Sequence, residues 1–151
     1  IDPKEWAQVL AVNLTGVFSC VQAEIAQMVK QEAGGSIVNT ASICGLVALP
    51  HATAYNSAKH GVIGLTKSAA VEYGPKKIRV NAVCPGFIDT PMLAKGAGAS
   101  QEVLDGVVRQ LPIRRIADPS EVADVVAWLM SPHSSYVTGV AMPIDGGWTA
   151  Q

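Results

Sequence analysis

Stretches with the spacing of amphipathic helices alternate with short β-branched stretches, and this alternation limits the possible folds most strongly. Segments 36–40, 78–83 and 139–144 are typical of strands. The intervening segments carry apolar residues three or four positions apart, which indicates helices. Helices and strands in alternation predict right-handed crossovers and a parallel sheet with helices on both faces. We therefore expect one α/β domain over residues 1–151.

Start and stop signals bound the helices. Asp2-Pro3-Lys4-Glu5 offers a capping carboxylate, a proline at the first helical position and a glutamate three residues after the cap. The same pattern recurs at 118–121. Glycines end two of the predicted helices. We expect helices over residues 3–32, 53–73 and 119–130, and an irregular, glycine-containing segment over 87–117.

Composition and charge exclude several classes of function. The net charge is −1 with no basic block, so no nucleic-acid partner is expected. No uninterrupted apolar run reaches the roughly 18 residues of a membrane helix, so no membrane association is expected. Cys20, Cys44 and Cys84 are an odd number without CxxC spacing, which predicts reduced core thiols in a cytoplasmic protein. No metal site is predicted.

Tyr55 and Lys59 lie four residues apart in the predicted helix over 53–73, so their side chains share one helix face. A nearby ammonium favours the phenolate and lowers the pKa of a tyrosine from about 10 towards neutral pH. Such a tyrosine can give a proton to a carbonyl or take one from an alcohol. An exposed helical pair has the same spacing, so a functional interpretation needs further residues.

Ser42 and Asn13 supply those residues. Ser42 follows the predicted strand 36–40, and open α/β sheets bind ligands beyond the carboxyl ends of their strands. It can hold a substrate oxygen before Tyr55, or simply cap a turn. Asn13 is an amide within an apolar helix stripe, where it needs a hydrogen-bond partner. It either satisfies a neighbouring backbone group or lies behind Lys59.

Four stretches together resemble the short-chain dehydrogenase/reductase (SDR) family. They occur in the family's order and spacing, and the resemblance continues to Asp145-Gly146-Gly147, effectively the whole chain. It implies the C-terminal, catalytic part of a Rossmann-like doubly wound parallel sheet in three αβα layers. It also implies an oxidoreductase that uses NAD or NADP and interconverts a carbonyl and a secondary alcohol. The stretches are VNLTGVF (12–18), GSIVNTAS (35–42), YNSAK (55–59) and RVNAVCPG (79–86).

The resemblance implies a role for each catalytic residue. Tyr55 is the general acid and base, and Lys59 lowers its pKa and holds the nicotinamide ribose. Ser42 positions the substrate oxygen, and Asn13 holds a water in a proton relay behind Lys59. For the cofactor, the resemblance adds Pro85, Gly86, Ile88 and Thr90 to Tyr55 and Lys59. For the substrate, we expect contacts from Ser42, Cys44 and His51 and a mobile binding loop over 87–117.

The glycine-rich strand, turn and helix with which this family binds pyrophosphate has no match in the sequence. Gly96-Ala97-Gly98 neither follows a strand nor completes GxGxxG. The chain begins at Ile1 without an initiator methionine, and we interpret it as cut from a larger protein, with the N-terminal βαβ units absent. The residue that discriminates NAD from NADP belongs to that part. Strand 36–40 would then expose an unpaired edge, and the isolated chain is expected to be poorly stable or inactive.

Two other functions remain open. A serine hydrolase with Ser42 and His51 is possible, although the chain has no GxSxG motif. A non-catalytic interaction module is the second, because the helices over 3–32 and 53–73 have wide apolar faces. In the SDR family the equivalent helices pair in homodimers or homotetramers. The substrate is expected to be a small ketone or alcohol, and sugars, β-ketoacyl thioesters and cyclic alcohols are not distinguished.

Overall fold

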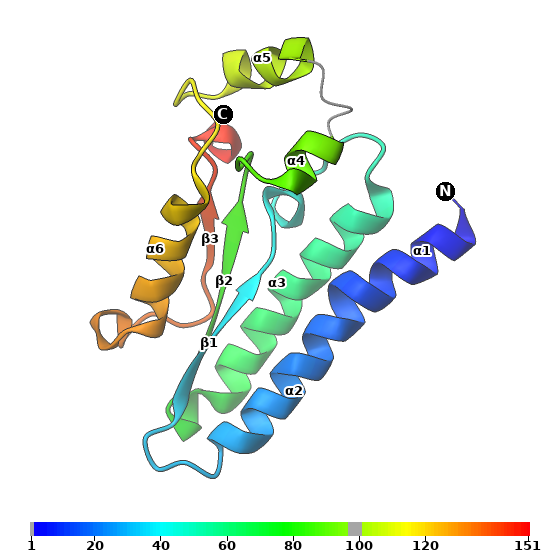
Figure 1. The fold of residues 1–151 in the computed structure, drawn as a ribbon. Coiled ribbons are helices and arrows are strands. Elements are labelled where there is room, and N and C mark those ends of the chain that lie inside the picture. Colours follow the sequence, from blue (N-terminus) through cyan, green and yellow to red (C-terminus); the bar gives the residue numbers. More distant parts are fainter. Residues whose placement is uncertain (1, 97–100) are drawn as a thin grey trace.

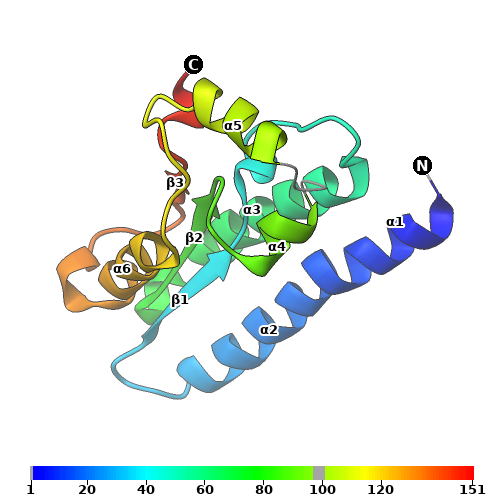
Figure 2. The same ribbon diagram turned by 45° about the horizontal axis from the view of Figure 1, so that its top comes forward.

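A computed structural model, which describes residues 2–96 and 101–151, contains a parallel sheet between two helical layers (Figures 1 and 2). Its strands are β1 (Gly35–Thr40), β2 (Ile78–Pro85) and β3 (Ala141–Ile144), in the order β1-β2-β3. Both pairs are parallel. Helix α3 (Thr53–Tyr73) and the N-terminal helix lie on one face, and α6 (Pro119–Met130) lies on the other. The predicted α/β architecture is confirmed.

The first predicted helix is shorter than expected and is interrupted. It consists of α1 (Pro3–Leu10), a π-helical turn η1 (Ala11–Thr15) and α2 (Gly16–Met28). Residues 29–33, expected to be helical, instead form tight turns in which main-chain amides donate three residues back. These turns lead to Gly34 at φ +71°, where a Cβ atom would lie 2.2 Å from the Lys77 carbonyl oxygen. This close approach requires glycine and brings the chain into β1.

The apolar residues of this helix stripe face the protein as predicted. All are buried or half-buried: Trp6, Leu10, Val17, Val21, Ile25 and Met28. One core cluster joins α2 and α3 to the sheet: Val21, Ile25, Ile37, Ala69, Ala70, Ile78 and Val80. A second lies nearer the carboxyl ends of the strands: Ala41, Val62, Ile63, Ala82 and Cys84. The second cluster supports the turn that carries Ser42.

The segment Pro3–Met28 is long and apolar enough, by length and composition alone, to cross a membrane. Charged and polar residues interrupt its apolar runs, and for this reason its sequence did not predict a membrane segment. Core helices of soluble proteins and signal sequences meet the same criterion. The helix also has apolar residues on its outer side, where Val12 is 66% and Phe18 48% exposed, and these raise its mean hydropathy.

The segment 87–117 contains more regular structure than expected. Two helices form within it, α4 (Pro91–Gly96) and α5 (Gln101–Gln110), and residues 97–100, including Gly98, lie outside the described residues. The two ends of the segment meet beyond β2. There the amide of Asp89 donates to the Ala117 oxygen at 2.9 Å, and the amide of Ala117 donates to the Phe87 oxygen at 3.1 Å.

Candidate functional site

Ser42 lies just beyond the carboxyl end of β1, as predicted. The amide of Ala41 still donates to the Val83 oxygen at 2.8 Å, which extends the ladder by one residue. The chain then turns into a short 3₁₀ helix, η2 (Ile43–Gly45), for which Ser42 is the N-cap. The Ser42 hydroxyl accepts the amide of Cys44 at 3.2 Å and is 9% exposed at the residue level. The capping role and a functional role are therefore compatible, because one hydroxyl oxygen accepts twice and donates once.

Helix α3 brings Tyr55 to Ser42. The Ser42 hydroxyl lies close enough to the Tyr55 phenol to lower its pKa, so residues 43–54 form a loop that brings the two side chains near each other. Burial raises the pKa of the Tyr55 phenol, the Ser42 hydroxyl opposes that increase, and the nearby Cys44 adds to it. The net direction is upward, so the phenol is protonated at neutral pH.

Lys59 lies one helical turn after Tyr55, with its Nζ 5.4 Å from the centre of the tyrosine ring. Its ammonium donates to the main-chain oxygen of Thr40, the last residue of β1, at 2.9 Å. Burial lowers the pKa of Lys59, and the thiols of Cys44 and Cys84 oppose the decrease. The lowering of the Tyr55 pKa by Lys59 stays a prediction. In this structure both groups are partly desolvated, which disfavours phenolate and ammonium alike.

Asn13 lies at the centre of the π-helical turn η1, which packs against α3. Main-chain bonds in a π turn reach five residues back, and the Asn13 amide group donates to the Val9 oxygen four residues back, at 3.2 Å. This is the backbone-satisfying alternative from the sequence analysis. Gly61 allows the close contact, because a Cβ there would lie 2.8 Å from the Leu14 side chain. π turns are frequent at functional sites, which is compatible with a functional role for Asn13. The role of Asn13 in holding a water behind Lys59 remains a prediction.

The cysteines divide into two groups. Cys44 and Cys84 are buried free thiols near Lys59, and burial is the main cause that raises the pKa of each. Cys20 is exposed, so the prediction that it is a core thiol is wrong. It lies on the outer side of α2, which nothing in the described part of the chain covers. His51 is exposed, in the loop between η2 and α3.

The residues assigned to the cofactor lie together beyond β2. Pro85 ends the strand, and the amide of Gly86 donates to the Ile144 oxygen at 2.9 Å. Ile88 forms a bridge with Ala117. Thr90 donates its hydroxyl to the Ile88 oxygen at 3.3 Å and accepts the amide of Leu93 at 3.4 Å. This stretch is thus folded, and it lies at the carboxyl ends of the strands, as Ser42 does.

Gly45 fixes the distance between the Ser42 turn and α3. A Cβ atom at this position would lie 2.7 Å from the Lys59 oxygen and 2.8 Å from the Ile63 Cδ1 atom. We expect Gly45→Ala to lower the free energy of unfolding by about 1–3 kcal/mol, the usual range for overpacking. Gly64→Ala is the matched control in α3, because a Cβ there meets nothing within 4 Å. Urea unfolding should give a lower midpoint for Gly45→Ala only; equal midpoints would contradict this account.

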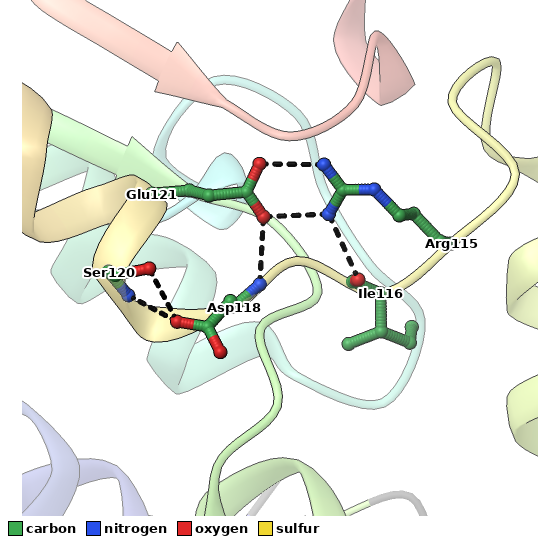
Figure 3. Close-up of polar contacts among 5 residues, drawn as sticks. All are labelled: Arg115, Ile116, Asp118, Ser120 and Glu121. Carbon is green, nitrogen blue, oxygen red and sulfur yellow. Dashed lines mark hydrogen bonds and ion pairs between the residues drawn. The ribbon is translucent and has the colours of Figure 1, made fainter.

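An ion pair links Arg115, near the end of segment 87–117, to Glu121 in α6 (Figure 3). Arg115 donates to both carboxylate oxygens of Glu121, at 2.6 and 2.7 Å. Glu121 also accepts the amide of Asp118, which completes a capping box at the start of α6. Both side chains line a cavity of about 310 Å³ beside the turn at 145–147. The sequence predicts the cap at the start of α6. It does not predict the pairing of Arg115 with Glu121, six residues later.

The Arg115 bond lowers the pKa of Glu121 from 4.5 to about 2. A carboxyl whose pKa is lowered by folding stabilises the fold above its unfolded pKa, and this contribution is lost as pH falls towards the folded value. We therefore expect Glu121→Gln to destabilise the protein at neutral pH and to have progressively less effect from about pH 4.5 to pH 2. Urea midpoints of both proteins across this range test the expectation. A difference that stays constant with pH would contradict it.

Comparison with known proteins gives one consistent result. Residues 1–149 match the sequence model of a family described as enoyl-(acyl carrier protein) reductase. The chain belongs to the SDR family. An A-factor type gamma-butyrolactone 1'-reductase of Streptomyces virginiae is 44% identical over 149 residues, which cover 99% of this chain and 58% of that SDR protein. A 3-oxoacyl-[acyl-carrier-protein] reductase of Thermotoga maritima is 45% identical over 144 residues, covering 95% of this chain and 57% of the relative.

Solved SDR structures agree with the fold. Levodione reductase superposes with a TM-score of 0.95 at 38% identity, covering 99% of this chain and 59% of the other. Actinorhodin polyketide ketoreductase, solved with NADPH, gives a TM-score of 0.94 at 36% identity, covering 100% and 61%. This chain thus spans a little over half the length of the SDR proteins that it matches.

Proposed function

We propose that this chain carries the catalytic residues of an NAD(P)-dependent oxidoreductase that interconverts a ketone and a secondary alcohol. The observation that carries the proposal is that the turn capped by Ser42 packs against α3 beside Tyr55, with Lys59 one helical turn further on. This arrangement offers the carbonyl oxygen of a substrate a hydrogen-bond donor and a proton source at the same place. It does not resemble a serine hydrolase, because the Ser42 hydroxyl lies beside a phenol, whereas the imidazole of His51 is exposed in the loop.

The protein's own part in the reaction is proton transfer and orientation. When bound, the nicotinamide supplies the hydride to the carbonyl carbon, or removes it from the alcohol. Ser42 donates to the substrate oxygen, and Tyr55 gives that oxygen its proton as the alcohol forms. Because burial keeps the phenol protonated, the site in this form suits reduction. Alcohol oxidation needs the phenolate and therefore favours higher pH.

Several residues fit a nicotinamide cofactor. The Lys59 ammonium has three donors, and one of them is directed to the Thr40 oxygen; the others can bind ribose hydroxyls. Pro85, Gly86, Ile88 and Thr90 would border the nicotinamide and the neighbouring phosphate. The choice between NAD and NADP stays open. We also propose that the pyrophosphate is held by residues beyond these 151, since they contain no matching glycine-rich segment.

The test uses the longest natural polypeptide that contains these residues, called the parent polypeptide below. It should oxidise NADH or NADPH in the presence of a 3-oxoacyl thioester, a cyclic ketone or a keto sugar. Ser42→Ala should reduce kcat/KM by about 10²-fold, the lower range for a positioned donor in a buried site, without changing nicotinamide binding. Hydrolysis of an ester by the parent polypeptide, lost in the same variant, would instead support the hydrolase.

A second function, as an interaction module, is favoured by one observation. A groove of about 390 Å³ runs between α2 and α3, lined by apolar side chains that include Phe18, Val29 and Leu65. Pairing of these helices with those of a second copy would bury it, and we propose a homodimer or homotetramer. The buried free thiols Cys44 and Cys84 are in keeping with a cytoplasmic location. Sedimentation of the chain without cofactor tests the association separately from catalysis.

A further inference from the structure

Asn56, the residue after the proposed acid, holds a segment outside its own helix. Its amide nitrogen donates to the Leu49 oxygen at 2.9 Å, and its side-chain oxygen accepts the Leu49 amide at 3.4 Å. The side-chain carboxamide of Asn56 thus satisfies both the main-chain N–H and the main-chain oxygen of Leu49. Asparagine can do this because its side chain carries an acceptor and a donor together. Alanine at position 56 could make neither bond.

The bound segment is the loop 46–52, which joins η2 to α3 (Figure 1). The main-chain N–H of Asn56 donates to the oxygen of Ala52, the cap residue of α3, at 2.7 Å, as that of any non-proline residue would. His51 has φ +60°, a left-handed conformation that non-glycine residues adopt rarely and that persists only where the surroundings enforce it. The Asn56 side chain therefore holds the loop at Leu49, just before this strained residue.

The position of this loop gives it a consequence for the substrate. It begins four residues after Ser42 and ends three before Tyr55, so it spans the gap between the two hydroxyls. It also carries apolar side chains that water still reaches, with Leu46 37% and Val47 36% exposed. The loop has no charged residue, and His51 is its one titratable side chain. A substituent beside a carbonyl held by Ser42 and Tyr55 would meet this apolar surface.

We propose that Asn56 is a positioning residue that fixes loop 46–52 as an apolar wall of the substrate site, and that the preferred substrates are ketones with an apolar substituent beside the carbonyl. The proposal rests on the proposed function. Its physical basis is that apolar contact is gained only if the wall is ordered before the substrate arrives, since ordering a loop on binding reduces affinity. Polyhydroxylated ketones gain little from such a wall.

The test compares Asn56→Ala with the unmodified parent polypeptide, using cyclohexanone and dihydroxyacetone as probes. The unmodified protein should prefer cyclohexanone. In the variant, KM for cyclohexanone should rise about tenfold, while kcat and KM for the nicotinamide stay within about twofold. KM for dihydroxyacetone should hardly change. Lys67→Ala, an exposed change on the same helix, is the control and should leave all constants unaltered.

Hydrogen exchange of the main-chain amides gives a readout that is independent of activity. Amides of residues 46–52 should exchange faster in Asn56→Ala, and those of β2 should not. Unchanged exchange would contradict the claim that Asn56 orders loop 46–52. Faster exchange with an unchanged preference between the two ketones would contradict the claim that this loop contacts the substrate. If the parent polypeptide reduces no ketone, the proposed function fails. The proposed wall fails with it, whereas the exchange data still decide whether Asn56 braces the loop.

Discussion

Replacing Tyr55 by phenylalanine should reduce turnover strongly while leaving the fold and nicotinamide binding in place. The substitution removes one oxygen atom, the phenolic oxygen beside the Ser42 hydroxyl. Without it, no described group supplies the proton that the substrate oxygen needs during reduction. General acid catalysis typically contributes about 10²–10⁴-fold, and we expect kcat of the parent polypeptide to fall by an amount in that range. Steady-state reduction of a ketone, with NADH and NADPH in turn, measures it.

Tyr73→Phe is the matched control for this experiment. Tyr73 is also on α3, but it is the last residue of the helix, whereas Tyr55 lies in the first turn. The same atom is removed far from Ser42, so activity should be unchanged. Sedimentation should show that both variants associate like the unmodified protein. Substantial activity in Tyr55→Phe would refute the proposed mechanism, and loss of association in that variant alone would favour the interaction module.

The 151-residue chain by itself should bind nicotinamide poorly and unfold at low urea concentration. In the described part of the chain β1 pairs only with β2, so its other edge has no strand partner. An unpaired edge of this kind favours aggregation and removes the stabilisation that a neighbouring strand would supply. The glycine-rich segment for the pyrophosphate is also absent from the sequence. Fluorescence titration with NADH should therefore show no saturation up to about 1 mM.

A gain-of-function experiment completes this prediction. This chain covers 57% of the Thermotoga maritima relative, and the residues of that relative that precede the matched region can be joined ahead of residue 1. The fusion should unfold cooperatively at a higher urea concentration and bind NADH or NADPH, because it supplies both the missing strands and the missing turn. Cooperative unfolding and micromolar NADH binding by the 151 residues alone would contradict the prediction. So would a fusion that folds but does not bind either nucleotide.

Much of the site could be predicted because its signals are local. Tyr55 and Lys59 share a face through helical spacing, and Ser42 follows a strand whose β-branched residues are evident. The alternation of helix and strand predicts that such residues gather at one edge of a parallel sheet. In the structure, the turn capped by Ser42 packs against α3, the helix that carries Tyr55 and Lys59. None of these inferences required knowledge of contacts between distant segments.

Other features depend on contacts that the sequence does not encode locally. The partner of Lys59 is a main-chain oxygen, that of Thr40, and any residue type at position 40 would offer the same oxygen. The π turn at Asn13 and the helices within 87–117 were not predicted, since weak periodicity does not distinguish them from a regular helix or a loop. The exposure of Cys20 likewise depends on which side of α2 is covered.

The sequence by itself determined the α/β class, the family resemblance and the candidate catalytic residues, because helix period, strand composition and motif spacing are properties of neighbouring residues. The tertiary structure decided the electrostatics and the support of the site. Burial raises the pKa of Tyr55 and lowers that of Lys59, and the spacing of the two residues predicts neither effect. Asn56 braces the loop beside them through two bonds to Leu49. Desolvation and main-chain hydrogen bonds arise only when distant segments pack together, and for that reason they appear only in the folded chain.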